Sequence, residues 1–327
     1  MRVGVIGTGI MGKNHVHAYS SLLPRCQIIG IYDVNHEQAN QLAKQYGIVA
    51  YQNISDLLDR VDAVSISVPT KLHFQVGKQC LERGKHVLME KPIAETTTQA
   101  ELLIELANKH GVKLHAGQIE LFNPVVNVLK DILNNEEVLA IEMHRFSPYQ
   151  TRHVHSDVVK NLMLHDIYLL EYLINRDITS VQVLGCLDGL QNPNHAAALV
   201  QLKGNIVAQL TASYYSITKV RTIHIMTKQA TINTDLIKKT IEIIRKPSHN
   251  NTNTALSLHE RVEVPEVDSL KNEIIDFLEA VEKDSPSRNT GFKGLKALAL
   301  SERVIQLIKS GEQKNNSPNG GEGGATT

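Results

Sequence analysis

The chain has 327 residues, enough for two domains of ordinary size that each bury a core. Apolar residues make up 42% and charged residues 21%, as in soluble globular proteins. The 34 lysines and arginines equal the 34 aspartates and glutamates, so no overall charge draws the chain to nucleic acid or to an acidic membrane. A phosphate-bearing ligand must therefore be held by local geometry.

Cysteine usage and hydropathy indicate a cytoplasmic protein. The three cysteines lack C-x-x-C spacing, which argues against a disulfide framework or a zinc site. No stretch reaches the roughly 18 consecutive apolar residues of a membrane span. The strand-like segment 1–7 (MRVGVIG) leaves no room ahead of it for a secretion signal. No histidine–glutamate spacing indicates a metal, and we expect none.

The first 120 residues alternate between strands and helices. Apolar, β-rich runs predict strands at 2–6, 27–32, 48–51, 63–68, 86–89 and 112–116. Helical patterns lie between them at 10–22, 35–46, 55–58, 72–83 and 98–110. Asn35 with Gln38, and Thr98 with Glu101, fit helix-capping signals. Strands separated by helices need crossover connections, which predicts an α/β domain over 1–120 with a doubly wound parallel sheet.

From about residue 121 the rhythm changes. Helical patterns at 124–133 and 158–174 flank a β-rich run at 138–144, and further β-rich runs with short connections fill 180–263. This predicts an open mixed or antiparallel sheet with one face packed on helices. Helices at 269–283 and 294–309 close this α+β domain, 121–310. The tail 311–327 has almost no apolar residues and is expected to be disordered.

A glycine fingerprint follows the first strand. The six residues from 7 to 12 match G-x-G-x-x-G and open a helix, as in a Rossmann dinucleotide-binding domain: Gly7, Thr8, Gly9, Ile10, Met11 and Gly12. The helix N-terminus favours a bound pyrophosphate. Asp33 ends the second strand, where a carboxylate can accept bonds from the ribose hydroxyls and repel a 2′-phosphate. We therefore expect NAD rather than NADP as the cofactor, unless Asp33 merely caps the following turn.

Four further segments carry a resemblance to a known family. They are VPTKLH (68–73), MEKPIAET (89–96), GQIELFNP (117–124) and NLMLHDIYLLEYL (161–173). With the fingerprint, they resemble the glucose–fructose oxidoreductase/inositol dehydrogenase (Gfo/Idh/MocA) family over nearly the whole chain, and most closely its UDP-N-acetylglucosamine 3-dehydrogenase-like branch. The resemblance implies an NAD-dependent oxidoreductase that transfers a hydride between nicotinamide and a secondary alcohol of a sugar or nucleotide-sugar.

The resemblance implies that Lys91, the lysine of E-K-P, acts at the reacting hydroxyl. A cation beside that oxygen stabilises the negative charge that develops as the hydride leaves. Glu90 would orient Lys91 or the nicotinamide ribose. The loop beside the nicotinamide would contain Pro69, Thr70 and His73. His73 could instead simply begin a helix, and Lys91 could be a surface lysine.

The long helix carries the second set of candidates. Where family members commonly show D-x-x-x-H-x-x-D, this chain has Asn161, His165 and Tyr168, whose spacing predicts one helical face. His165 is the candidate acid/base, since a neutral imidazole can accept the hydroxyl proton. Asn161 and Tyr168 are candidate substrate-binding residues. Asp166 does not replace the missing carboxylate, because it lies about 100° around the helix from His165.

Two further departures lie in the stretch 117–124. The branch usually reads G-H-I-E-R-F-N-P, and this chain has Gln118, a candidate substrate-binding residue, and Leu121 instead. Loss of the arginine weakens the case for a UDP-sugar acid as substrate. Basic and histidine residues before the long helix are possible pocket residues, although such loops are more often solvated: His144, Arg145, Arg152, His153 and His155.

The departures leave two alternatives open. The chain could be a non-catalytic, NAD-binding regulatory or partner subunit with a degenerate substrate site, or a reductase of another carbonyl or imine. In this family an open sheet face commonly makes a subunit contact, so we expect a homodimer or homotetramer.

Overall fold

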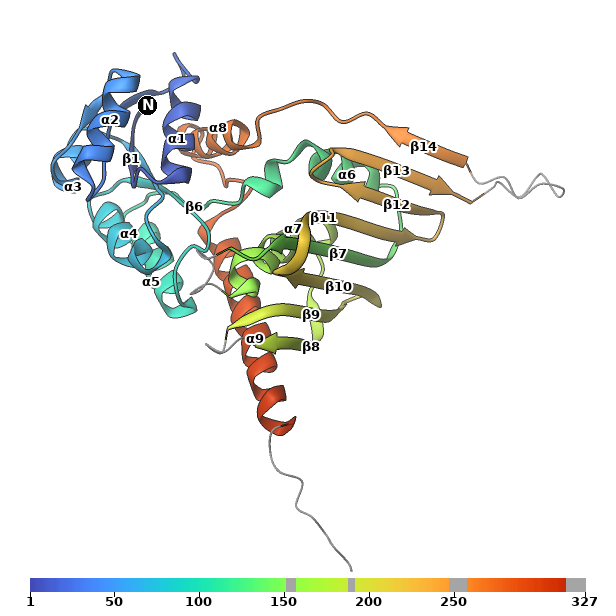
Figure 1. Cartoon of the computed structure of the whole chain (residues 1–327). Helices are drawn as coiled ribbons and strands as arrows, with labels where there is room; N and C mark the ends of the chain where they lie inside the picture. The colour runs from blue at the N-terminus through green and yellow to red at the C-terminus, as the bar shows by residue number, and fades with distance from the viewer. Residues whose placement is uncertain (151–156, 188–191, 247–257, 316–327) are drawn as a thin grey trace, which may run out of the picture.

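The computed structural model of the chain describes residues 1–150, 157–187, 192–246 and 258–315 (Figure 1). Two sheets dominate it, one at each end, with helices between them. The six-stranded sheet is parallel and has the order β3-β2-β1-β4-β5-β6. Its strands are β1 (Arg2–Ile6), β2 (Gln27–Tyr32), β3 (Val49–Ala50), β4 (Ala63–Ile66), β5 (His86–Met89) and β6 (Leu114–Ala116). The predicted Rossmann domain is confirmed.

Helices cover both faces of this sheet. The connecting helices are α1 (Ile10–Ser20), α2 (His36–Tyr46), α3 (Ile54–Leu58), α4 (His73–Glu82) and α5 (Thr97–Lys109). One apolar core joins the sheet to α1 and α2, and a second joins it to α3, α4 and α5. Packing on both faces explains why the strands are runs of apolar residues rather than alternating patterns.

One helix cap lies where the sequence predicts it, and another lies two residues earlier than predicted. The side chain of Asn35 accepts a hydrogen bond from the backbone nitrogen of Gln38 at 3.1 Å, as predicted. The cap of α5 is Thr96, whose hydroxyl accepts from the backbone nitrogen of Gln99 at 3.3 Å, so the predicted capping role of Thr98 is wrong. Thr96 with Gln99 fits the same capping pattern two residues earlier.

The second sheet has eight strands in the order β14-β13-β12-β11-β7-β10-β9-β8. All neighbours are antiparallel except β7 and β10, so the predicted mixed open sheet is confirmed. Its strands are β7 (Val138–Pro148), β8 (Ile178–Leu187), β9 (Pro193–Leu202), β10 (Ile206–Ser213), β11 (Tyr215–Thr227), β12 (Ala230–Asp235), β13 (Thr240–Arg245) and β14 (Leu258–Val262).

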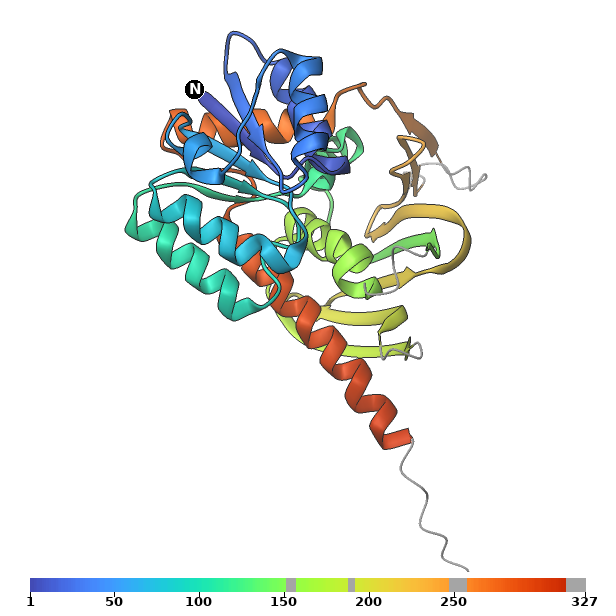
Figure 2. The same ribbon diagram turned by 60° about the vertical axis from the view of Figure 1, so that its left-hand side comes forward.

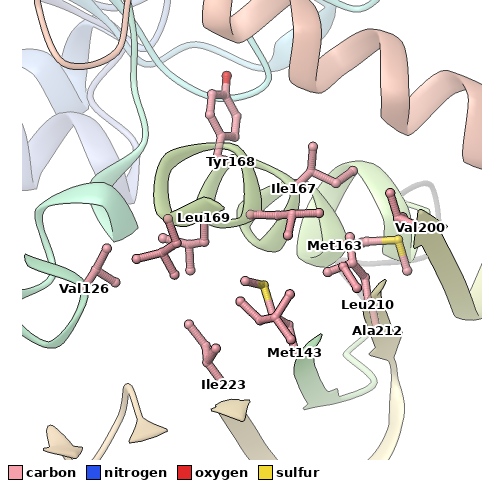
Figure 3. Packing of buried hydrophobic residues seen from close by; sticks show 14 of the residues in the cluster. Val126, Met143, Met163, Ile167, Tyr168, Leu169, Val200, Leu210, Ala212 and Ile223 are labelled. Atoms are coloured by element: carbon pink, nitrogen blue, oxygen red, sulfur yellow. The ribbon is translucent and has the colours of Figure 1, made fainter. Parts of the chain in front are cut away.

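One face of this sheet packs on helices. Side chains from α6 (Pro124–Leu133) and α7 (Leu164–Ile174) meet alternate residues of the strands in a single apolar core (Figure 3). Met143 of β7 and Leu210 of β10 belong to this covered face and are fully buried. The opposite face lacks such a cover among the described residues and exposes the side chains of Leu184, Leu199 and Val207.

The predicted helix 158–174 contains a change of winding. Residues Val159–Met163 form a π-helical turn, after which α7 continues as an α-helix. Turns of this kind often occur at functional sites because they reposition the side chains next to them. Asn161 lies within this turn.

Two C-terminal helices return to the first domain. Phe277 of α8 (Ser269–Glu282) is fully buried in the core formed by β1, α1 and α2. Helix α9 (Gly291–Asn315) runs from the first domain past β8 and β9 (Figure 2). The predicted domain 121–310 therefore holds the second sheet but also supplies α8 to the first core. Helix α9 continues beyond Gly311, where the sequence predicted a disordered tail, and residues 316–327 lie outside the described part.

No helix among the described residues is both long enough and apolar enough to cross a membrane.

Candidate functional site

The glycine loop between β1 and α1 leaves space for a phosphate group. Gly7 has a φ of 92°, and a β-carbon there would strike the backbone of Ser67. A β-carbon at Gly12 would overlap the carbonyl oxygen of Gly7. By contrast, no described atom lies within 4 Å of the position a β-carbon of Gly9 would take. Gly7 and Gly12 thus shape the turn, and Gly9 keeps open the space before the N-terminus of α1, where an anion can bind.

Asp33 lies at the end of β2 beside this loop. One carboxylate oxygen accepts hydrogen bonds from the backbone nitrogen (2.6 Å) and the hydroxyl (2.9 Å) of buried Thr8. The other accepts from the backbone nitrogen of Asn35 at 2.8 Å, so Asp33 also caps the following turn. These hydrogen bonds fix the carboxylate against the loop. Ile10, the first residue of α1, is 71% exposed, and Met11 is half-buried.

Glu90 follows β5 at the carboxyl edge of the sheet. Its Oε1 lies 3.0 Å from Nε2 of buried His15 in α1, and its Oε2 accepts from the backbone nitrogen of Lys91 at 3.2 Å. Burial alone raises the pKa of a carboxyl group, but the hydrogen bond with His15 and the charges of His15 and Lys91 lower the pKa of Glu90 below its ordinary value. Glu90 is therefore an anion that ties α1 to the end of β5.

His73 begins α4, as one sequence alternative proposed, and its buried ring joins two loops. Nδ1 lies 2.8 Å from the carbonyl oxygen of Pro92, and Nε2 lies 2.9 Å from that of Val68. Burial lowers the pKa of this ring, and a neutral imidazole donates only one of these bonds at a time. Pro69 is exposed and Thr70 half-buried between these loops.

The side chain of Lys91 reaches from the first domain to the second. Its Nζ donates to the backbone carbonyl and to the side-chain oxygen of Asn161, both 3.1 Å away. The amide nitrogen of Asn161 donates to the hydroxyl of Tyr214 at 2.6 Å. This second bond fixes the amide so that its oxygen faces the ammonium. Both acceptors are neutral, so Asn161 binds the ammonium without forming an ion pair with it.

The surroundings make Lys91 easier to deprotonate. Burial lowers its pKa to about 8; the charge of Glu90 opposes this shift, and those of Arg145 and Arg221 add to it. A cavity of about 350 Å³ adjoins the ammonium. Its other polar lining residues are Thr70, Glu95, Asp157, Lys160 and Asn161. Lys91 can therefore exchange a proton with a hydroxyl group bound in this cavity near physiological pH.

His165 is held by Gln118, which follows strand β6 of the first domain. Its Nδ1 lies 2.6 Å from Oε1 of Gln118, whose backbone nitrogen donates to Glu273 of α8. A carboxamide oxygen only accepts, so Nδ1 carries the ring proton and Nε2 presents its lone pair. Burial lowers the pKa of His165 well below its ordinary value, and the charges of Lys91 and Arg145 lower it further. The ring is therefore neutral at physiological pH.

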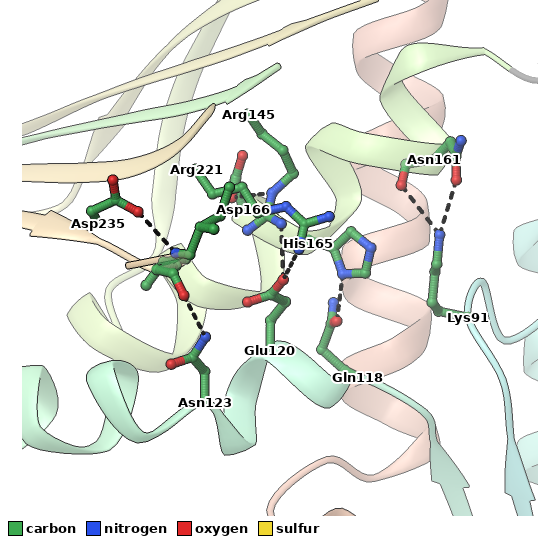
Figure 4. A network of polar contacts seen from close by, with 12 residues as sticks. Lys91, Gln118, Glu120, Asn123, Arg145, Asn161, His165, Asp166, Arg221 and Asp235 are labelled. Carbon is green, nitrogen blue, oxygen red and sulfur yellow. Dashed lines mark hydrogen bonds and ion pairs between the residues drawn. The ribbon is translucent and has the colours of Figure 1, made fainter. Parts of the chain in front are cut away.

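A set of ion pairs lies next to His165 (Figure 4). Arg145 of β7 is fully buried, with its Nε 2.8 Å from Asp166 and its Nη1 3.0 Å from Glu120. The Nη1 of Arg221 in β11 lies 3.2 Å from the same oxygen of Glu120. Asp166 thus faces away from the cavity at Lys91, as its helical position predicted. It anchors α7 to the sheet.

Some sequence candidates lie elsewhere. Tyr168 lines a separate pocket with Leu121 and Tyr172, apart from the cavity that Asn161 lines. Asn161 contacts Lys91, and His165 contacts Gln118. Neighbouring residues of a strand point to opposite faces, so His144 lies on the open face of the sheet while Arg145 lies on the covered face. The ring centroid of His144 is 6.2 Å from that of His224. The remaining pocket candidates lie outside the described residues: Arg152, His153 and His155.

Several residues of the site received no role from the sequence. They are His15, Glu120, Tyr214, Arg221 and Glu273. Glu120 lies within the segment 117–124 that carries the resemblance, and His15 lies three residues after the last glycine of the fingerprint. No sequence signal distinguishes the other three from ordinary core or strand residues. Among the described residues, no group of three histidine, cysteine, aspartate or glutamate side chains could hold a metal ion.

Comparison with known proteins identifies the family of the chain. The pattern of an oxidoreductase family with an NAD-binding Rossmann fold matches residues 1–118. A UDP-N-acetylglucosamine 3-dehydrogenase from Acidithiobacillus ferrooxidans is 30% identical over 310 residues, which are 95% of this chain and 98% of that enzyme. The chain belongs to the Gfo/Idh/MocA family. The expected resemblance to that branch is also confirmed.

Two structures and a second relative extend the comparison. The structure of the Acidithiobacillus enzyme, GnnA, has a TM-score of 0.88 at 29% identity and covers 95% of this chain and 98% of its own. An inositol 2-dehydrogenase from Rhodococcus jostii is 29% identical over 60% of this chain and 57% of its own. A levoglucosan dehydrogenase in complex with NADH and levoglucosan shares the fold, with a TM-score of 0.84 at 16% identity, covering 95% and 97%.

Two glycine substitutions test separately the role of the turn in stability and the role of the loop in anion binding. Gly12→Ala places a β-carbon on the backbone of Gly7, so we expect a loss of about 1–3 kcal/mol of unfolding free energy. Gly9→Ala meets no described atom and should unfold like the unaltered protein while binding NADH at least about tenfold more weakly. Thermal unfolding and calorimetry measure the two effects. Unchanged NADH affinity in Gly9→Ala would show that the loop does not hold the cofactor.

Asn161→Asp tests the electrostatics of Lys91. A carboxylate about 3.1 Å from Nζ favours the charged ammonium, so we expect the pKa of Lys91 to rise by about one unit or more from its value of about 8. At pH 8 more Lys91 is then protonated, and it should react more slowly with an amine-specific reagent. Mass spectrometry of labelled protein across pH gives the midpoint, with exposed Lys78 as the internal control. An unmoved midpoint would contradict this.

Proposed function

We propose that the protein is an NAD-dependent dehydrogenase that oxidises a secondary alcohol of a sugar or nucleotide-sugar, or reduces the matching ketone. The observation that carries the proposal is the position of Lys91. Its ammonium lies past the carboxyl end of β5, the edge where ligands bind in open α/β sheets. There it meets Asn161 and adjoins a cavity.

The two candidate catalytic residues have complementary protonation states. Lys91 donates two hydrogen bonds to neutral oxygens, and a substrate hydroxyl could replace either acceptor without the loss of an ion pair. As an ammonium it stabilises negative charge on that oxygen. His165 is neutral and presents Nε2, which can accept the hydroxyl proton. Asn161 would then orient the substrate.

The residues around the glycine loop fit a bound dinucleotide. The open space at Gly9 and the N-terminus of α1 suit a pyrophosphate. Asp33 suits ribose hydroxyls and disfavours a 2′-phosphate, which supports NAD over NADP. Glu90, Pro69, Thr70 and His73 would border the nicotinamide. When bound, the cofactor supplies the hydride acceptor or donor.

The relatives support the substrate class. The UDP-N-acetylglucosamine 3-dehydrogenase and the inositol 2-dehydrogenase are named for the oxidation of ring hydroxyl groups. Gln118 lies beside His165 and would contact such a ring from the side of the first domain.

The second candidate function is a non-catalytic NAD-binding subunit, and Asn161 is the observation that favours it. A carboxylate at this position would hold Lys91 charged, whereas Asn161 leaves it with a lowered pKa. Turnover separates the two functions, because a binding subunit holds NAD without reducing it.

The open face of the second sheet supports a homo-oligomer. Leu184, Leu199 and Val207 are exposed there on neighbouring strands, and apolar side chains grouped on one face commonly mark a subunit contact. We propose a dimer or tetramer built on this face, and a monomeric mass by light scattering at micromolar concentration would contradict it.

Turnover tests the proposed function. Purified protein mixed with NAD and a panel of sugars and nucleotide-sugars should produce the absorbance of reduced nicotinamide with at least one of them. Lys91→Met should lower the rate by about 10²-fold or more while NADH still binds, because only the reacting oxygen loses its partner. Lys78→Met, an exposed lysine of α4, is the matched control. Bound NAD without turnover on any sugar would favour the binding subunit.

A further inference from the structure

Two arginines lie directly opposite each other on the covered face of the second sheet. Arg221 of β11 pairs with Arg145 of β7 in the antiparallel ladder, and their side chains meet the same carboxylate, Glu120. Like charges opposite each other on neighbouring strands destabilise a sheet unless something compensates them. The compensation in this cluster is unequal.

Arg145 is the compensated member. Asp166 and Glu120 bind two different nitrogens of its guanidinium, at 2.8 and 3.0 Å, and its side chain is 1% exposed. Arg221 has a single acceptor among the described residues, the Glu120 oxygen that Arg145 already uses, at 3.2 Å. Most of the N–H donors of Arg221 are therefore available to another group.

Arg221 is also the accessible member. Its side chain is 37% exposed, although it lies on the helix-covered face among buried groups. Its charge lowers the pKa of both Lys91 and His165, which places it within electrostatic reach of the candidate reaction site. In Figure 4 His165 lies between Lys91 and the arginine cluster. Of the two arginines beside His165, only Arg221 is therefore accessible to a ligand, because the side chain of Arg145 is 1% exposed.

The carboxylates beside Arg221 are already engaged by its neighbour. Glu120 and Asp166 are both buried, and both bind Arg145. Glu90 beside Lys91 pairs instead with His15 and with the backbone nitrogen of Lys91. Beyond the shared Glu120, Arg221 therefore has no carboxylate partner among the described residues.

We propose that Arg221 binds an anionic group of the substrate, a carboxylate or a phosphate, across His165 from the hydroxyl held at Lys91. This rests on the proposed function, because it names the class of sugar that the site accepts: a sugar acid or a sugar phosphate rather than a neutral sugar. The planar guanidinium can form two parallel hydrogen bonds to either group. The loss of an arginine at Leu121 is thereby offset by one on β11.

The cofactor does not account for Arg221. Its pyrophosphate belongs at the open space of Gly9 in the first domain, whereas Arg221 belongs to the second sheet. Under the proposed function, the exposed guanidinium is therefore available to the substrate.

Calorimetry of the NADH-loaded protein tests the proposal with three probes: glucose, glucuronate and glucose 6-phosphate. With reduced cofactor these alcohols can bind without reacting. At least one charged probe should bind about 10- to 100-fold more tightly than glucose, and the preferred one identifies the anion as carboxylate or phosphate. Arg221→Met should remove this preference, and Arg221→Lys should retain part of it. Arg261→Met, which removes an exposed arginine of the edge strand β14, should change nothing.

Equal NADH affinity in all variants shows that the fold is kept, since Glu120 still pairs with Arg145 when Arg221 is replaced. No tighter binding of either charged probe by the unaltered protein, or a preference that survives in Arg221→Met, would overturn the proposal. Calorimetry measures binding alone. A result against Arg221 therefore leaves hydride transfer intact, and a failure of turnover leaves the binding preference measurable.

Discussion

The site depends on one constraint: a lysine ammonium is held between two domains by neutral oxygens. Removing a charge from water is costly unless hydrogen bonds replace the lost hydration, and Asn161 supplies two. Burial lowers the pKa of Lys91 to about 8, and neutral acceptors do not oppose this shift as a carboxylate in their place would. The end of β5 and the π-helical turn must both be in place for this contact to form. The folding of both domains is thus coupled to the chemistry.

The residues around Lys91 act mainly by positioning the candidate catalytic side chains. Glu90 joins α1 to the strand that ends at Lys91, and Glu273 of α8 fixes the backbone of Gln118, which sets the tautomer of His165. Helix α8 lies near the end of the chain but packs in the core of the first domain. Through Glu273, the first domain therefore supports the substrate side of the site. Buried carboxylates of this kind hold neighbours through hydrogen bonds rather than by reacting.

Short-range patterns in the sequence predict the local structure and the order of the elements. They predict few of the contacts between residues that are distant in the sequence. The glycine turn, the Asn35 cap and the alternation of strand and helix follow from short-range rules and are confirmed. A spacing of three residues predicts one helical face for Tyr168 and His165, but helical spacing does not reveal what packs against each position. The contact of Glu120 with Arg221 joins residues 101 positions apart, which only the folded sheet brings together. The capping pattern fits both Thr96 and Thr98, so it could not fix where α5 begins.

A crystal structure with NADH bound would test the central claim most directly. We expect the pyrophosphate at Gly9, the ribose hydroxyls at Asp33, and the nicotinamide ring beside Pro69 with its C4 facing the space between Lys91 and His165. A dinucleotide bound elsewhere, or a ring turned away from Lys91 so that no substrate carbon could lie between them, would contradict the assignment of Lys91 to the reacting oxygen.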